Sequence, residues 1–156
     1  MVDLEVRIVK LEPMRVAYVM AISETPERDA WDKMLAWAEP KGLLNDLEKH
    51  PVFGFNNPSP SPDRKDYGYE FWIRVDPGIE PEGEIELKDF EGGEYAVITC
   101  KLIGDPLGTV PGIWMKLWEW VQTSQHTMRK VHELEKLRNP LESEEDMMLD
   151  LYLPVE

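Results

Sequence analysis

The chain has 156 residues, 42% hydrophobic and 31% charged, a composition typical of one folded domain with its own core. Its formal net charge of −14 argues against nucleic acid and anionic membrane surfaces as partners. The single cysteine, Cys100, excludes an internal disulfide. Because the sequence shows no signal peptide and no apolar run of about 18 residues, we expect a cytoplasmic protein.

The first forty residues predict a long strand and a helix. Apolar residues alternate over 2–8 and again over 14–20, which indicates one edge strand bent at Pro13, since proline cannot donate to a ladder. Thr25 is a typical helix-capping residue, and Pro26 follows at the first helical position. The helix is expected to end near residues 40–42. Its expected buried face holds Trp31, Met34, Leu35 and Ala38.

Residues 67–75 read as a strand with two unlike faces, after a short strand at 52–55 and a proline-rich loop at 57–62. The odd-numbered residues, from Tyr67 and Tyr69 to Val75, form the expected core face. The other face carries Glu70 two residues from Trp72. One interpretation is a simple solvated face. The alternative is a pocket wall for a flat, lipophilic or cationic ligand, with these four residues as candidates: Tyr67, Tyr69, Glu70 and Trp72.

The second half repeats this order after a linker at 77–83. A strand interrupted at Gly92-Gly93 spans 85–100, and a turn-rich loop leads to a helix after Pro111. Trp114, Leu117, Trp118 and Val121 stand at helical spacing, so packing explains them. The two tryptophans are also candidate pocket residues. Residues 128–137 are ambiguous, and 147–153 predict a final strand.

Strand–helix–strand–strand therefore occurs twice if 128–137 supplies a strand. This order predicts an α+β fold of two βαββ halves, about 1–78 and 79–156, within one domain. We expect antiparallel pairing, helices on one face, a pseudo-twofold relation between the halves and a ligand groove at their interface.

Three motifs resemble the GyrI-like small-molecule-binding proteins, which are related to the effector-binding domains of multidrug-responsive and AraC-type bacterial regulators. The motifs are the strand at 67–75, the turn and strand at 92–96, and the ending at 149–155. The resemblance covers nearly the whole chain and implies a stand-alone binder, since no room remains for a helix-turn-helix module.

The resemblance also implies a glutamate among aromatic residues in the ligand groove. In the family it lies in a Leu-Glu-x-x stretch after the second helix, which matches Leu134-Glu135-Lys136-Leu137 here. Glu135 inherits the role, and Glu133 is the alternative because it has the same parity in a strand. The sequence departs from the family pattern at Leu137, where an aromatic residue is common. Without the resemblance, both glutamates read as solvated charges.

Three functions follow from this resemblance. The first is capture of lipophilic, planar or cationic compounds. The second is hydrolysis of electrophilic, cyclopropanoid-type toxins, with Glu135 as the catalytic general base and Glu70 or a tyrosine as the acid. The third is modulation of a protein partner such as DNA gyrase. His50, His126 and His132 have no metal-ligand spacing, so we expect neither a metal nor a cofactor. The oligomeric state is left open.

Overall fold

Strands dominate the computed structural model, which describes residues 5–57 and 59–156, and contacts divide the chain into two units. The α1 unit, Pro13–Glu91, is named for helix α1 (Pro26–Ala38). The α2 unit, which joins the described part of Met1–Glu12 to Gly92–Glu156, is named for helix α2 (Val110–Gln122). Val2, Leu4 and Pro58, which belong to the predicted strand and loop, lie outside the described residues.

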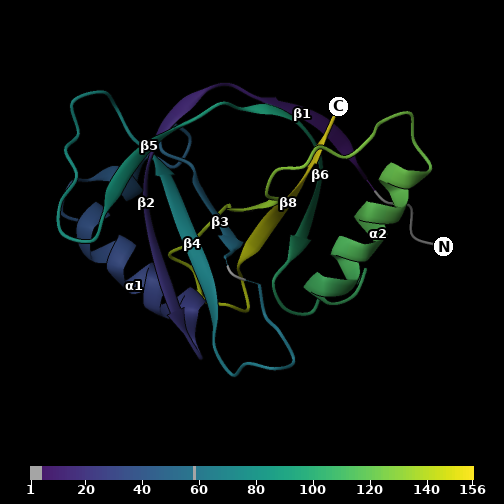
Figure 1. The fold of residues 1–156 in the computed structure, drawn as a ribbon, viewed down its shortest axis with the longest axis horizontal. Coiled ribbons are helices and arrows are strands. Elements are labelled where there is room, and N and C mark those ends of the chain that lie inside the picture. Colours follow the sequence, from purple (N-terminus) through teal and green to yellow (C-terminus); the bar gives the residue numbers. More distant parts are fainter. Residues whose placement is uncertain (1–4, 58) are drawn as a thin grey trace. The chain divides into compact units, whose positions relative to one another are not determined.

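The α1 unit holds an antiparallel sheet in the order β3-β4-β2-β5. Helix α1 packs on β2 and β4 (Figure 1). The ring centroids of Trp31 and Phe71 lie 5.3 Å apart. The elements are β2 (Met14–Ser23), α1, the 3₁₀ turn η1 (Leu43–Asn45), β3 (Val52–Asn56), β4 (Tyr67–Arg74) and β5 (Glu86–Phe90).

Helix α1 differs from its prediction in two details. Pro26 is its first residue, as expected, but the Thr25 side chain makes no capping hydrogen bond. The hydroxyl of Thr25 instead donates to Asp29 Oδ2 at 3.4 Å. The buried residues are also displaced from the predicted face: they are Pro26, Ala30, Met34, Trp37 and Ala38.

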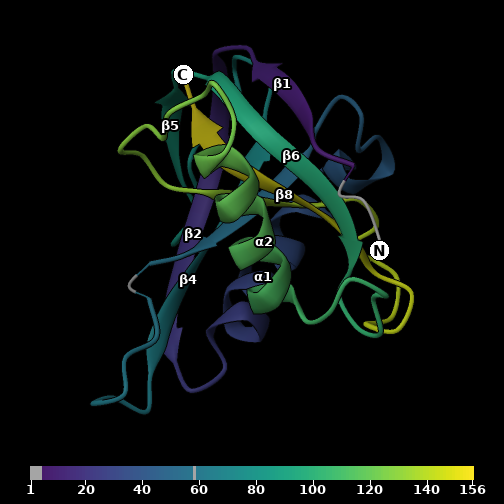
Figure 2. The ribbon, with the colours of Figure 1, turned by 90° about the vertical axis from the view of Figure 1, so that its right-hand side faces the viewer.

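The α2 unit also holds an antiparallel sheet, in the order β1-β6-β8-β7. Helix α2 packs on β6 and β8 (Figure 2). Its elements are β1 (Arg7–Leu11), β6 (Gly93–Lys101), α2, β7 (Leu134–Leu137) and β8 (Met148–Val155). Strand β7 resolves the ambiguous stretch at 128–137. The predicted α+β class and antiparallel pairing are confirmed, while a twofold relation between the units stays a prediction.

Strands β1 and β5 each pair in a different unit from the strand that follows them in the sequence. Strand β1 runs into β2 in the sequence but pairs with β6, from Arg7↔Val97 to Leu11↔Gly93. Strand β5 runs into β6 but pairs with β2, from Met14↔Phe90 to Tyr18↔Glu86. Residues 7–11 and 14–20 are therefore two strands with different partners and not one bent strand, and the contact-defined units divide after residues 12 and 91. The reason is that Pro13 marks the point where the chain leaves one sheet for the other.

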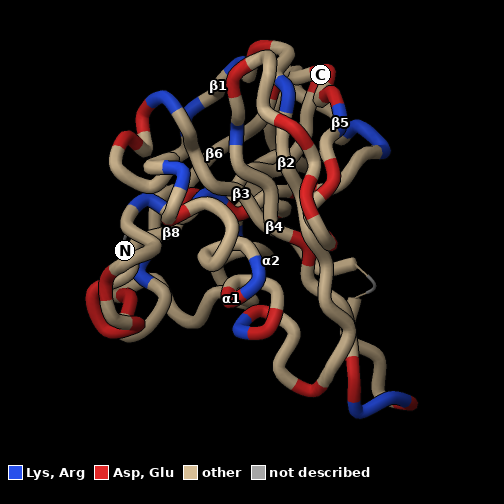
Figure 3. Tube along the Cα trace, turned by 90° about the vertical axis from the view of Figure 1, so that its left-hand side faces the viewer, with Lys and Arg blue, Asp and Glu red and all other residues tan. Residues whose placement is uncertain are grey.

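Acidic residues outnumber basic ones by 31 to 17, and both kinds are spread along the chain (Figure 3). Among the helices that the structure describes, none has the length and apolar character needed to cross a membrane.

Gly92 lies in the crossover between β5 and β6, where the chain passes from the α1 unit to the α2 unit, and should tolerate no side chain. Its φ is +80°, and an added Cβ would lie 2.2 Å from the carbonyl oxygen of Leu11. Gly83 is the matched control, since its φ is +60° and an added Cβ would meet nothing within 4 Å. Gly83→Ala should lower the free energy of unfolding by about 1–2 kcal/mol through backbone strain. Gly92→Ala should cost about 1–3 kcal/mol more through overpacking. Urea denaturation measures both, and equal losses would contradict the close packing at the crossover.

Candidate functional site

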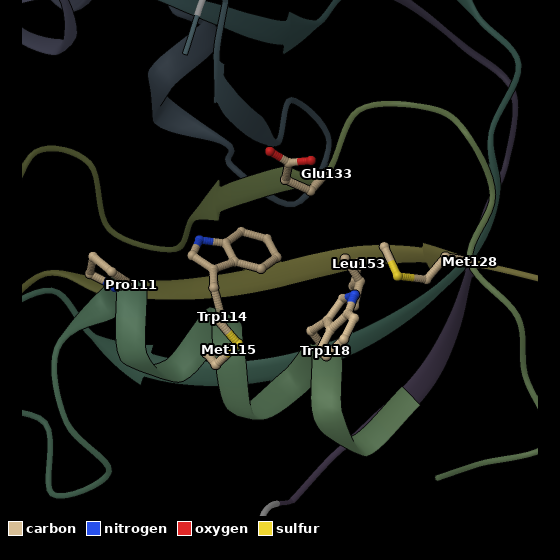
Figure 4. Close-up of a pocket in the computed structure, with 7 residues that line it drawn as sticks. All are labelled: Pro111, Trp114, Met115, Trp118, Met128, Glu133 and Leu153. Carbon is tan, nitrogen blue, oxygen red and sulfur yellow. The ribbon is translucent and has the colours of Figure 1, made fainter. Parts of the chain in front are cut away.

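The α2 unit carries an apolar groove of about 450 Å³. Two tryptophans and two methionines dominate its lining, and Glu133 supplies a carboxylate at one side (Figure 4). Met115 is 57% exposed and Trp118 44%, so large apolar surface faces solvent. The lining residues are Pro111, Trp114, Met115, Trp118, Met128, Glu133 and Leu153.

The rotation of α2 places the tryptophans in this groove. The helix buries Ile113, Leu117 and Val121, which lie four residues apart on one stripe. Trp114 and Trp118 each come one residue after a buried residue, Ile113 and Leu117, so they lie beside the buried stripe and not in it. Both indoles project toward the groove (Figure 4). Leu117 and Val121 are buried as the spacing predicted, whereas Trp118 is not a core residue.

Glu133 and Glu135 stand in different relations to the groove. Glu133 is exposed, immediately precedes β7 and belongs to the lining. Glu135 is half-buried inside β7 and pairs in register with Leu151. Register partners share a sheet face, and so do residues two apart in one strand. Glu135 therefore shares a face with Leu151 and with Leu153, which lines the groove.

Burial and nearby carboxylates both affect the Cys100 thiol. Burial, and after it the negative charges of Asp105, Glu135 and Asp150, together raise the pKa of this thiol to about 12. A thiol with so high a pKa is protonated at neutral pH and a poor nucleophile, so Cys100 is a packing residue of β6. The described residues contain no group of three or more His, Cys, Asp or Glu side chains placed to hold a metal ion.

In the α1 unit, Glu70 and Trp72 are in direct contact, as the strand pattern suggested, and a cation of the protein itself lies beside both. Glu70 is 5% exposed and accepts a hydrogen bond from the Trp72 indole. Lys88 Nζ lies 2.7 Å from Glu70 Oε2. The same ammonium lies 4.2 Å from the Tyr18 ring centroid and 4.6 Å from that of Trp72. This face of β4 is therefore buried and internally paired, and not a solvated face.

Tyr67 and Tyr69 lie on the opposite face of β4. The Tyr67 hydroxyl donates to the Glu27 carboxylate, 2.7 Å from Oε2. Tyr69 is 4% exposed and packs on Phe71, with ring centroids 4.9 Å apart. Its ring also occupies the space beside Gly54, where an added Cβ would lie 2.4 Å from a ring carbon. Tyr69 is thus a core residue.

The eight candidate residues are divided equally between the two units. The α1 unit holds Tyr67, Tyr69, Glu70 and Trp72, and the α2 unit holds Trp114, Trp118, Glu133 and Glu135. Sequence reasoning missed Met115 and Met128 in the groove, and Lys88 beside Glu70. Helical spacing does place Met115 next to Trp114. Nothing local indicates Lys88, because its position depends on the pairing of β5 with β2.

A family model described as integron-associated effector-binding protein (Cass2) matches residues 7–155. No individually curated protein matched the chain. The family match agrees with the resemblance drawn from the three sequence motifs.

Solved structures share the fold. The EcmrR chain of an EcmrR–DNA complex has a TM-score of 0.69 and 16% identity, over 97% of this chain and 57% of EcmrR. A hydrolase from Listeria innocua has a TM-score of 0.67 and 14% identity, over 97% of this chain and 91% of that one. SAV2435 bound to tetraphenylphosphonium has a TM-score of 0.52 and 14% identity, over 97% and 94%. This chain therefore spans little more than half of EcmrR, and identities this low establish the fold alone.

The Tyr67–Glu27 contact generates a pH-dependent prediction. Burial, and after it the hydrogen bond to Glu27 and the charge of that carboxylate, together raise the pKa of Tyr67 from 10.0 to about 12. Between these two values the unfolded chain loses a proton that the folded chain keeps, so this tyrosine should make stability fall as pH rises. Tyr67→Phe should remove that part of the decline in urea denaturation at alkaline pH.

Glu27→Gln is the companion variant. It should lower the pKa of Tyr67 while leaving it above the ordinary value, because burial persists. Tyrosinate absorbance, taken as the difference from Tyr67→Phe, reports this pKa. A Tyr67 that titrates identically in the parent and in Glu27→Gln would contradict the contact.

Proposed function

Because the chain belongs to the family of integron-associated effector-binding proteins, small-molecule binding is its general function, and we propose that its groove in the α2 unit captures lipophilic or planar cations. The observation that carries the proposal is the pairing of exposed indoles and thioethers with a carboxylate in one concave surface. Flat aromatic faces attract cations through their quadrupoles, and a carboxylate adds charge complementarity.

The groove dimensions and side chains fit such a ligand. Its volume of about 450 Å³ falls in the range of drug-sized sites. Met115 and Met128 are flexible and polarizable, so the lining suits ligands of varied shape. The net charge of −14 draws cations toward the protein at low salt. SAV2435, which shares the fold, has been solved with the lipophilic cation tetraphenylphosphonium.

The proposal predicts which side chains a bound cation uses. Tetraphenylphosphonium should bind the parent and quench tryptophan fluorescence. Trp118→Ala should weaken binding by about 1–2 kcal/mol through the lost cation–π contact. Glu135→Gln should weaken it by about 2–5 kcal/mol if ligand entry desolvates that carboxylate. If the exposed Glu133 is the partner, Glu133→Gln should have the larger effect. Isothermal titration calorimetry measures each loss.

Glu119→Gln is the matched control. Glu119 is an exposed glutamate of α2 outside the groove lining, so the variant removes the same charge with only a field effect. Triphenylphosphine oxide, a neutral compound of similar shape, should bind the parent more weakly than the cation. Binding that is unchanged in Trp118→Ala and in both glutamate variants would overturn the groove as the site.

A second candidate function is hydrolysis of an electrophile. Two glutamates share the groove face, and the fold also occurs in a Listeria innocua hydrolase. One glutamate would take a proton from water as the hydroxyl oxygen bonds to the electrophilic carbon of a strained ring. The ring carbon–carbon bond breaks, its electron pair stays on the departing carbon, and that carbon takes a proton from solvent, so the product is the substrate plus water. Glu70 is poorly suited to be the acid partner, because Lys88 holds it as a charge-paired carboxylate.

Mass spectrometry separates the two functions. After incubation with a cyclopropanoid electrophile, catalysis would give the substrate mass plus water, with loss of turnover in Glu133→Gln or Glu135→Gln. Binding alone would give unchanged mass and co-elution with the protein. Turnover that survives in both variants would contradict a groove glutamate as general base.

A further inference from the structure

The surroundings of Glu70 have the composition of a ligand site. The carboxylate is 5% exposed, and it accepts hydrogen bonds from three donors of different elements. Asn57 Nδ2 lies 3.5 Å from Oε1, and the Trp72 indole and Lys88 Nζ both donate to Oε2. Of these three donors, only the lysine carries a positive charge that compensates the buried carboxylate.

Two aromatic faces complete the surroundings of this ammonium group. Tyr18 and Trp72 are register partners on β2 and β4, and their rings lie within 4.2 and 4.6 Å of Lys88 Nζ. The Trp72 ring is itself held by Phe55 and Phe90, at centroid distances of 5.2 and 5.1 Å. Acid and rings are therefore fixed by the sheet and by packing, and the lysine is the long, flexible member of the group.

We propose that Tyr18, Trp72 and Glu70 form an ammonium-binding cage in which Lys88 is the resident ligand, and that primary alkylammonium compounds are the class that fills the cage once the lysine side chain is removed. The cage lies wholly in the α1 unit, so this inference is independent of the groove proposed above. The Lys88 side chain is 36% exposed, which leaves the cage a route to solvent along the lysine stem.

The geometry selects the ligand class. An ammonium group with N–H donors can bond to the buried carboxylate while its charge faces the two rings. A quaternary ammonium ion has no N–H and is larger, so it forfeits the hydrogen bond to Glu70. A neutral amine or alcohol leaves the carboxylate uncompensated, which is costly at a buried site.

The test is to remove the resident ligand and supply the missing atoms. Lys88→Ala deletes three methylenes and the ammonium group, which together correspond to n-propylammonium. We expect n-propylammonium to raise the Tm of Lys88→Ala in a concentration-dependent manner and to leave the parent at its value in sodium chloride of equal ionic strength. Tetramethylammonium should bind the variant at least about tenfold more weakly, the equivalent of one lost charge-assisted hydrogen bond.

Two further variants supply controls. Lys88→Met removes the charge but leaves a chain that fills the space, so n-propylammonium should not stabilise it. The double variant with Glu70→Gln and Lys88→Ala keeps the space but loses the anion, so its affinity should also fall at least about tenfold. Each is measured by thermal denaturation and by calorimetric titration.

Three outcomes would overturn the proposal. One is a Lys88→Ala protein that n-propylammonium neither stabilises nor, where it is unfolded, restores. Another is equal response of Lys88→Ala and Lys88→Met. The third is equal affinity with and without the Glu70 charge. Binding of tetraphenylphosphonium, measured in parallel, reports on the groove and separates failure of one proposal from failure of the other.

Discussion

The fold depends on the exchange of β1 and β5. Strand β1 is followed in the sequence by β2 but pairs with β6 of the α2 unit. Strand β5 is followed by β6 but pairs with β2 of the α1 unit. Register pairs such as Arg7↔Val97 and Met14↔Phe90 join distant parts of the chain, so the strands of each unit are fully paired only after a contact of long sequence separation has formed. Loop-closure entropy must be overcome before these contacts stabilise anything, which favours slow and cooperative folding. Pro13 and Gly92 stand at the crossovers because one lacks an N–H donor and the other adopts a positive φ.

The two helices show how similar units acquire different roles. Helices α1 and α2 each have 13 residues, but they bury different positions. The fifth and ninth residues of α1, Ala30 and Met34, are fully buried, whereas the fifth and ninth of α2 are Trp114 and Trp118. The buried stripe of α2 lies one residue earlier, which corresponds to a rotation of about 100° about the helix axis. That rotation turns two indoles out of the core and makes a groove where α1 has packing.

Local patterns predicted the elements well, and non-local pairing decided most of what they missed. Alternation and turn residues were enough for β4 and β8, because each is bounded by its own sequence. The same alternation led to the wrong prediction that β1 and β2 are one strand, because nothing in the sequence near Pro13 indicates that they pair with different partners. In α2, apolar residues fill two adjacent stripes, so helical spacing alone could not separate the core stripe from the tryptophans beside it.

The candidate acids illustrate the same limit. The sequence placed Glu70 beside Trp72, and this contact exists, but the cation that completes it comes from β5 through the pairing of Val16 with Lys88. Glu135 was selected by resemblance, and it shares the groove face only because β7 pairs with β8 in a register that sets it opposite Leu151. A carboxylate near an indole is thus an incomplete description of a cation site until the register of the neighbouring strands is known.

The partner of each acid determines what that acid can do. Glu70 is buried, and leaving it unpaired would cost several kcal/mol, so the fold keeps Lys88 in contact with it. Glu133 is exposed, so water can solvate it at little cost until a ligand arrives. A ligand that binds at Glu133 must therefore offset only the loss of the water that solvates this carboxylate. A ligand at Glu70 must also displace Lys88, which is covalently tethered and so has a high effective concentration. Capture of varied cations is consistent with the first arrangement, and selection of one small ammonium class with the second.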